Sequence, residues 1–255
     1  MFVKLFVKIG IAVVVYLIFL IVYLPASLLV SVAPLPNNIQ FAGVDGTLWD
    51  GKADLVRIDQ RQLEQVSWQL SPWALFIGRA DIDFKIGTRA TAVSSKGSIS
   101  YSFSGLQVEN LRFDAPNSFI VAGARLPFRA QLNGDISLMV EKLEQGLPWC
   151  EQLKGKLFLN STHVINQFGE YPLGNIALGL NCLDGQVQLT TDEQLNQLGL
   201  VGTITLAENN LVKVSAKIKP TAAQPKDLTE ALAFLGRQDS QGYYPINYQG
   251  AIPGL

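Results

Sequence analysis

The chain has 255 residues, with 20 lysine and arginine residues against 21 aspartate and glutamate residues, and its formal net charge is −1. This balance gives no reason to expect nucleic acid or another strongly charged partner. Apolar residues make up 48% of the chain and charged residues only 16%, whereas charged residues are roughly 25% of soluble domains. The composition therefore argues against disorder and favours contact with a membrane.

The apolar bias is concentrated near the start of the chain. No charged residue occurs between Lys8 and Asp45, and residues 9–24 have the sequence IGIAVVVYLIFLIVYL. The apolar stretch over residues 3–24 is ~30 Å long as a helix, which is enough to cross a bilayer once the lysine amines of this stretch reach toward the headgroups. We therefore expect a transmembrane signal-anchor helix over residues 9–30.

The alternative to a retained anchor is a cleaved signal peptide, whose apolar core is shorter, roughly 7 to 15 residues. The small residues 31–33 (Ser-Val-Ala) could form a cleavage site, but Pro34 follows them directly and disfavours cleavage. The two lysines at the N-terminal end place residues 1–8 in the cytoplasm by the positive-inside rule. Residues 35–255 are then expected outside the cytoplasm, as a single β domain.

Two-residue alternation of apolar and polar side chains, which often starts at a glycine, dominates the chain from residue 78 onward. In residues 78–86, for example, Ala80, Ile82 and Phe84 share one face while the charged residues share the other. The same pattern recurs in residues 97–104, 134–140, 155–159, 175–180, 185–189, 202–206 and 211–219. Such segments are typical of half-buried antiparallel strands. The fold is therefore expected to be mainly β, a curved antiparallel sheet that forms an open barrel, a trough or a sandwich around its apolar face.

One short helix is expected near the C-terminus. Asp227 can cap it, Glu230 can complete a capping box, and Gly236 can end it. Its apolar stripe would be Leu228, Leu232 and Leu235. Residues 219–225 are expected to be a linker and residues 242–254 an extended chain.

Residues typical of catalysis are scarce. His163 is the only histidine, so it has no second histidine with which to share a metal. Residues 46–52 have the glycine and lysine spacing of a P-loop, but Ala53 stands where a hydroxyl would hold magnesium. Asp45 and Asp50 bracket a turn without the alternating ligands of an EF-hand. We therefore expect no enzymatic activity, no catalytic residue, no cofactor and no metal ligand.

Cys150 and Cys182 are the two cysteines of the chain, with 31 residues between them. An even pair in an oxidising compartment usually forms a disulfide, and we expect one here. The alternative is a pair of buried free thiols. Their spacing matches neither a redox motif nor a zinc site.

Glycine and tryptophan residues form two further motifs after the apolar segment. Residues 46–51 have the pattern Gly-Thr-Leu-Trp-x-Gly, and residues 68–72 the pattern Trp-x-Leu-x-Pro. Other elements are the single anchor, Trp149 next to the first cysteine, and the terminal pairs Gly242-x-x-Pro245 and Gly250-x-x-Pro253. In their order along the chain these elements resemble protein N of the bacterial type II secretion system. The first motif is also similar to one in AsmA-type periplasmic β proteins.

The resemblance to secretion protein N implies an inner-membrane protein of a bacterium with two membranes, anchored by its N-terminal helix with its body in the periplasm. It implies a non-enzymatic role in export of folded proteins across the outer membrane, with other inner-membrane and periplasmic subunits as partners. The similarity to AsmA-type proteins implies an alternative, in which an apolar groove of the sheet binds or transfers lipid.

Five residues of the two motifs are candidates for a structural or interaction role: Gly46, Trp49, Gly51, Trp68 and Pro72. One interpretation packs the Trp49 indole under the first hairpin, where the glycines permit a tight turn. The other makes Trp49, Trp68 and Trp73 a membrane-proximal surface that rests on the bilayer or faces a partner protein. The solvent exposure of the indoles distinguishes the two.

Overall fold

The structure is a computed structural model that describes residues 2–32, 36, 38–122, 131–167, 169–191, 196, 198–222, 224 and 226–251. The expected start of the β domain at Leu35, the cleavage candidate at Ala33 with Pro34, and Pro253 lie outside the described residues.

Two helices, α1 (Phe2–Val22) and α2 (Ala26–Val32), open the chain. The helix expected over residues 9–30 is therefore interrupted after Val22. Pro25 accounts for the break, because proline disfavours helical backbone at the preceding residue and has no N–H to continue a helix; it forms an isolated bridge with Thr47 instead. In the part of the chain that the structure describes, no helix meets the length and apolarity needed to span a membrane.

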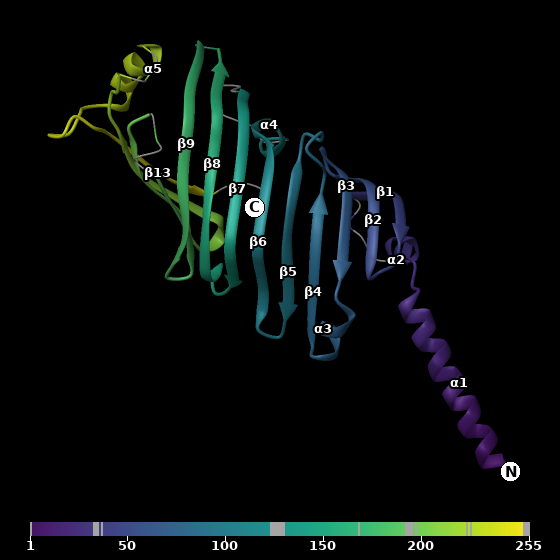
Figure 1. Cartoon of the computed structure of the whole chain (residues 1–255). Coiled ribbons are helices and arrows are strands. Elements are labelled where there is room, and N and C mark those ends of the chain that lie inside the picture. Colours follow the sequence, from purple (N-terminus) through teal and green to yellow (C-terminus); the bar gives the residue numbers. More distant parts are fainter. Residues whose placement is uncertain are drawn as a thin grey trace.

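The rest of the chain is dominated by one antiparallel sheet of 13 strands, in which each strand pairs with its neighbours in sequence (Figure 1). The strands are β1 (Ile39–Gly46), β2 (Asp50–Ile58), β3 (Arg61–Leu70), β4 (Arg79–Ile86), β5 (Ser94–Ser102), β6 (Gly105–Pro116), β7 (Gln131–Gln145), β8 (Cys150–Asn166), β9 (Gly169–Leu183), β10 (Gln186–Thr191), β11 (Leu200–Leu206), β12 (Leu211–Ile218) and β13 (Tyr244–Ala251). β1 and β13 lie at the two ends of this order and do not pair with each other. Of the expected forms, the sheet is therefore the open one.

Each segment predicted from alternation overlaps a strand, so the mainly β prediction is confirmed. Short helices interrupt the sheet: α3 (Pro72–Phe76), α4 (Asn117–Ile120), the 3₁₀ turn η3 (Glu208–Asn210), α5 (Lys226–Ala231) and the 3₁₀ turn η4 (Leu232–Leu235). The expected C-terminal helix is present and Gly236 follows it, but it starts at Lys226, so Asp227 lies within the helix and not at its cap. The tail expected as extended chain supplies β13.

One face of the sheet is apolar along almost its whole width. Directly paired residues on this face form one row across β3–β8: Leu70, Ile82, Ile99, Val108, Leu143 and Leu153. A second row crosses β6–β13: Leu111, Val140, Gly155, Leu180, Leu189, Ile204, Val214 and Tyr248. The opposite face is polar, and on it Lys142 donates to Glu144 at 2.8 Å, which raises the pKa of Lys142.

The total accessible surface is 17046 Å², whereas a compact monomer of this length would expose roughly 11,000 Å². The excess has two sources: the side chains of α1 from Ile9 to Val22 are exposed, and the apolar face of the sheet lacks the second layer that covers such a face in most domains. Loop residue Leu198 and α5 residue Leu228 pack over β9 near Ile176 and Leu178. Much of the apolar face elsewhere is only half-buried.

Because consecutive strands are antiparallel, alternate connections lie at the same end of the strands. The connections at one end are residues 47–49, 71–78, 103–104, 146–149, 184–185 and 207–210, and we call this end of the strands the lower edge. Figure 1 shows α1 extending from the sheet on this side, next to α3, while α4 and α5 lie at the opposite edge.

Candidate functional site

The turn between β1 and β2 joins α1 to the sheet. The Leu48 N–H donates to the Leu24 carbonyl at 2.9 Å, and the Trp49 indole N–H donates to the Ile21 carbonyl, also at 2.9 Å. The last carbonyls of a helix lack the i+4 N–H partner of the helix interior. The Ile21 carbonyl accepts instead from the Leu24 N–H at 3.4 Å and, at the shorter distance, from the Trp49 indole. We call this contact between the turn and the end of α1 the junction.

The end of β3 also forms hydrogen bonds to the β1–β2 turn. The Trp68 indole N–H donates to the Leu48 carbonyl at 3.1 Å, and the Leu70 N–H donates to the Trp49 carbonyl at 2.7 Å. Two indoles in series thus connect β3 to the β1–β2 turn and that turn to α1. Both motifs found in the sequence take part in this one contact.

The glycines of the first motif are required by the geometry of the turn. Gly46 has φ of 86°, a left-handed conformation that side chains disfavour. A Cβ on Gly51 would lie 2.3 Å from Cζ2 of Trp68, which is inside the van der Waals distance. The turn therefore needs glycine at both positions, once for conformation and once for the close approach of an indole.

Pro72 of the second motif starts α3 at the lower edge. Proline is favoured at the first position of a helix because its fixed φ suits that position and no N–H is needed there. Three side chains after Pro72 point into solvent, whereas Ala74 is buried: Trp73 is 77% exposed, Phe76 82% and Ile77 74%. The rings of Trp73 and Phe76 lie 5.9 Å apart. α3 therefore presents an apolar surface next to α1.

A groove of ≈ 910 Å³ separates α3 from α1. One wall is formed by Ile18, Ile21 and Val22 of α1, and the other by side chains of α3 that include Trp73 and Phe76. Every residue that lines it is apolar except Thr47, and none is charged.

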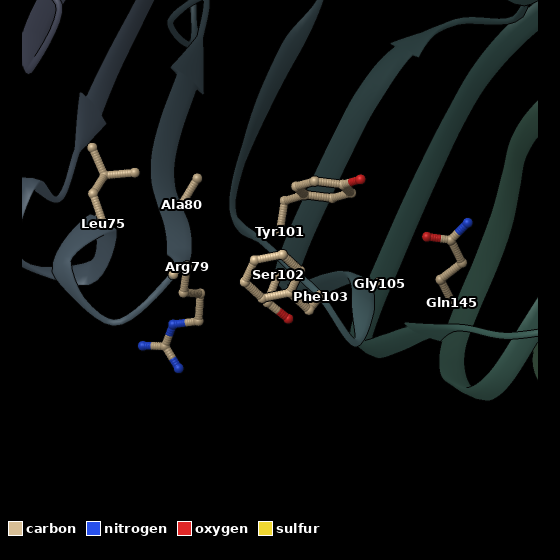
Figure 2. Close-up of a pocket in the computed structure, with 9 residues that line it drawn as sticks. Leu75, Arg79, Ala80, Tyr101, Ser102, Phe103, Gly105 and Gln145 are labelled. Atoms are coloured by element: carbon tan, nitrogen blue, oxygen red, sulfur yellow. The ribbon is translucent and has the colours of Figure 1, made fainter.

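A second hollow, of ≈ 440 Å³, lies at the lower end of the apolar face, between α3 and the β5–β6 turn. Figure 2 shows Ala80 and Tyr101 on neighbouring strands, with Leu75 to one side and Gln145 to the other. Phe103 at the tip of the turn is fully exposed. The lower end of the apolar face is thus open, and its rim carries exposed aromatic side chains.

The tryptophans of the two motifs and Trp73, which follows the second motif, differ in their exposure. Trp49 and Trp68 are half-buried and bonded to main-chain carbonyls, whereas Trp73 is exposed on α3. Sequence reasoning did not find the bond between Trp49 and α1, nor the exposed side chains of Phe76, Ile77 and Phe103. A usable signal was the apolar run of residues 73–77 between a strand and Gly78.

Cys150 and Cys182 form a disulfide with a Cα–Cα distance of 6.1 Å. It links the start of β8 to the end of β9 at the lower edge, and Cys150 packs against Val140 and Leu153 in a core cluster. Next to it, the Trp149 indole N–H donates to the Ala207 carbonyl at 2.8 Å.

The residues considered for catalysis belong to strands and a hairpin of the sheet. His163 is in β8, with its Nδ1 2.7 Å from the Ser161 carbonyl. The segment with P-loop spacing is the β1–β2 hairpin, where the Lys52 amine lies 3.8 Å from an Asp45 carboxylate oxygen. Within the described ranges, no three histidine, cysteine or acidic side chains gather where they could hold a metal ion.

Comparisons with known proteins agree over most of the chain. A family model described as "Type II secretion system (T2SS), protein N" matches residues 37–247. Proteins named "Type II secretion system protein N" are similar along almost their whole length. The one from Aeromonas hydrophila is 31% identical over 93% of this chain and 94% of its own. The one from Vibrio cholerae is 29% identical over 91% and 92%, and the one from Pectobacterium carotovorum 23% identical over 93% of each. No solved structure matches the chain significantly. These matches confirm the family resemblance drawn from the motifs.

Proposed function

The chain belongs to the type II secretion system protein N family, and on that basis we propose that it is a non-enzymatic, membrane-anchored component of the secretion apparatus that assists export of folded proteins across the outer membrane. The observation that carries this proposal is the extent of the family match, which runs from residue 37 to residue 247 and so includes nearly the entire sheet. The partners would be other inner-membrane and periplasmic subunits of the same apparatus.

The anchoring part of the proposal rests on α1. The side chains of residues 8–23 are all exposed. Residues 9–23 carry no charge, and most of them are apolar. A helix that is apolar on every side is stable when lipid surrounds it. We propose that residues 1–8 lie in the cytoplasm, that α1 from residue 9 onward crosses the inner membrane, and that residues 35–255 lie in the periplasm. The disulfide supports this placement, because disulfides persist in oxidising compartments.

The test is deletion of the gene, followed by assay of secreted hydrolases in the medium and in the periplasm. The proposal predicts that the hydrolases accumulate in the periplasm and that the full chain supplied on a plasmid restores their release. A periplasmic marker that no secretion system exports serves as the control for leakage. Normal release from the deletion strain would count against the proposal.

A second candidate, lipid binding, is favoured by the half-buried apolar face. Lipid extracted from the purified chain and identified by mass spectrometry would test it. Ile204→Asp places a carboxylate on the apolar face, whereas Thr205→Asp places one on the opposite face of the same strand and is the matched control. Lipid binding predicts that Ile204→Asp loses bound phospholipid and that Thr205→Asp keeps it. Equal lipid content in both variants would contradict it.

A further inference from the structure

We propose that α3 and Ile77 lie in the outer headgroup region of the bilayer that α1 crosses, and that the groove between α1 and α3 holds a phospholipid acyl chain. This inference rests on the anchoring proposed above and adds to it a second contact between the sheet and the membrane.

The position of α3 along the axis of α1 supports this proposal. The groove is lined by Ile18 as well as by Ile21 and Val22, and Ile18 lies roughly 6 Å along the helix axis before Val22. α3 therefore extends alongside the last turn of α1 instead of stopping above it. Since the apolar stretch continues to residue 24, a bilayer around α1 would also surround α3.

The side chains on α3 suit that position. Large exposed apolar patches are rare on surfaces that face water, whereas tryptophan is enriched at the level of the lipid headgroups. Trp73, Phe76 and Ile77 form such a patch, and Phe103 on the next lower-edge turn is also exposed. All four lie on the side of the sheet from which α1 extends.

The chemistry of the groove favours lipid over a protein partner. Its walls contain no charged side chain, and the rim of a protein interface is usually polar and hydrogen-bonded. The nearby Arg79 is half-exposed and paired with Asp81, and Figure 2 shows its side chain directed away from the strands at the lower edge. A guanidinium at this place lies where phosphate headgroups are expected.

Depth-dependent fluorescence quenching tests the proposal on the full chain. The chain is reconstituted into vesicles of phosphatidylethanolamine and phosphatidylglycerol whose acyl chains carry bromine either near the headgroup or near the chain end. The difference between wild type and Trp73→Phe isolates the emission of Trp73. We expect that bromine near the headgroup quenches this emission more strongly than bromine near the chain end, and that aqueous acrylamide quenches it weakly.

A charged variant and a matched control complete the test. Phe76→Asp should restore acrylamide access to Trp73, with loss of quenching by bromine. Phe234→Asp replaces a residue that is 93% exposed in η4, on the edge away from α1, and should leave both measurements unchanged. If Trp73 of the wild type is quenched by acrylamide and not by bromine, the proposal is overturned.

Flotation of the same vesicles separates the two levels of inference. If the wild-type chain does not float with the vesicles, the anchoring itself is wrong. If the chain floats but Trp73 remains open to acrylamide, anchoring stands and only the position of α3 is overturned. If Trp73 becomes protected only when other secretion subunits are added, α3 binds a protein and the lipid assignment is overturned.

Discussion

The indole N–H of Trp49 lies 2.9 Å from the main-chain carbonyl oxygen of Ile21 and donates a hydrogen bond to it. This bond connects residues of two regions that are 28 positions apart in sequence, the end of α1 and the first turn of the sheet. The bond thereby holds the sheet directly at the C-terminal end of α1. The lower edge of the sheet lies on the side from which α1 extends.

Trp49→Phe removes this bond while keeping an aromatic ring. One hydrogen bond contributes about 0.5–1.5 kcal/mol to stability, so a modest loss is expected in thermal unfolding. The more specific result is faster proteolysis between Val22 and Ala26, because the junction opens. Trp149→Phe is the matched control: it loses an indole bond to the Ala207 carbonyl at the β11 end of the sheet. Equal proteolysis of residues 23–25 in the two variants would argue against the role given to Trp49.

Gly51→Ala should destabilise the junction, because its new methyl group would lie 2.3 Å from the Trp68 ring. Overpacking of this kind costs about 1–3 kcal/mol. Gly179→Ala provides the comparison, since its nearest contact is the Thr190 carbonyl at 3.9 Å. Thermal unfolding should show a lower melting temperature for Gly51→Ala alone. A Gly51→Ala variant as stable as Gly179→Ala would mean that Trp68 moves without cost.

Replacement of both cysteines by alanine should lower stability by roughly 3 to 4 kcal/mol, because the disulfide closes a loop in the unfolded chain. Denaturant unfolding of the native and variant chains measures this loss. Mass spectrometry after alkylation provides an independent check on the bond. Two added groups are expected only after reduction, and two added groups without reduction would show free thiols.

The proposed topology predicts the activity of a reporter joined to the C-terminus. Alkaline phosphatase folds only outside the cytoplasm, so its fusion after Leu255 should be active. A reporter that works only in the cytoplasm should be inactive at the same site. The reverse pair of results would place the sheet on the cytoplasmic side.

Alternation predicted those strands in which every second side chain is apolar, such as β4 over Arg79–Ile86. It did not predict β3 or β6, because a residue with positive φ interrupts the alternation in each: Gln65 in one and Asn110 in the other. At these residues the next inward apolar side chain comes after three positions instead of two: Val66 follows Leu63, and Leu111 follows Val108. A two-residue period cannot represent such a shift.

The candidate site was predictable in its residues but not in its contacts. Gly46, Gly51 and Pro72 were recognisable because turns and helix starts restrict the choice of residue. The bond from Trp49 to Ile21 depends on where the end of α1 meets the sheet. A local pattern holds no information on that distance, and the exposed position of Phe103 depends equally on the whole order of the strands.

We propose that the sheet works in secretion at the place where α1 holds it. The most direct measurement compares two chains in the deletion strain: the full chain, and residues 35–255 released into the periplasm by a cleavable signal peptide. Secreted hydrolase is assayed in the medium, and the disulfide and protein level confirm that the released sheet is folded. We expect the full chain to restore secretion and the released sheet to leave the hydrolase in the periplasm. Equal restoration by the two chains would contradict it.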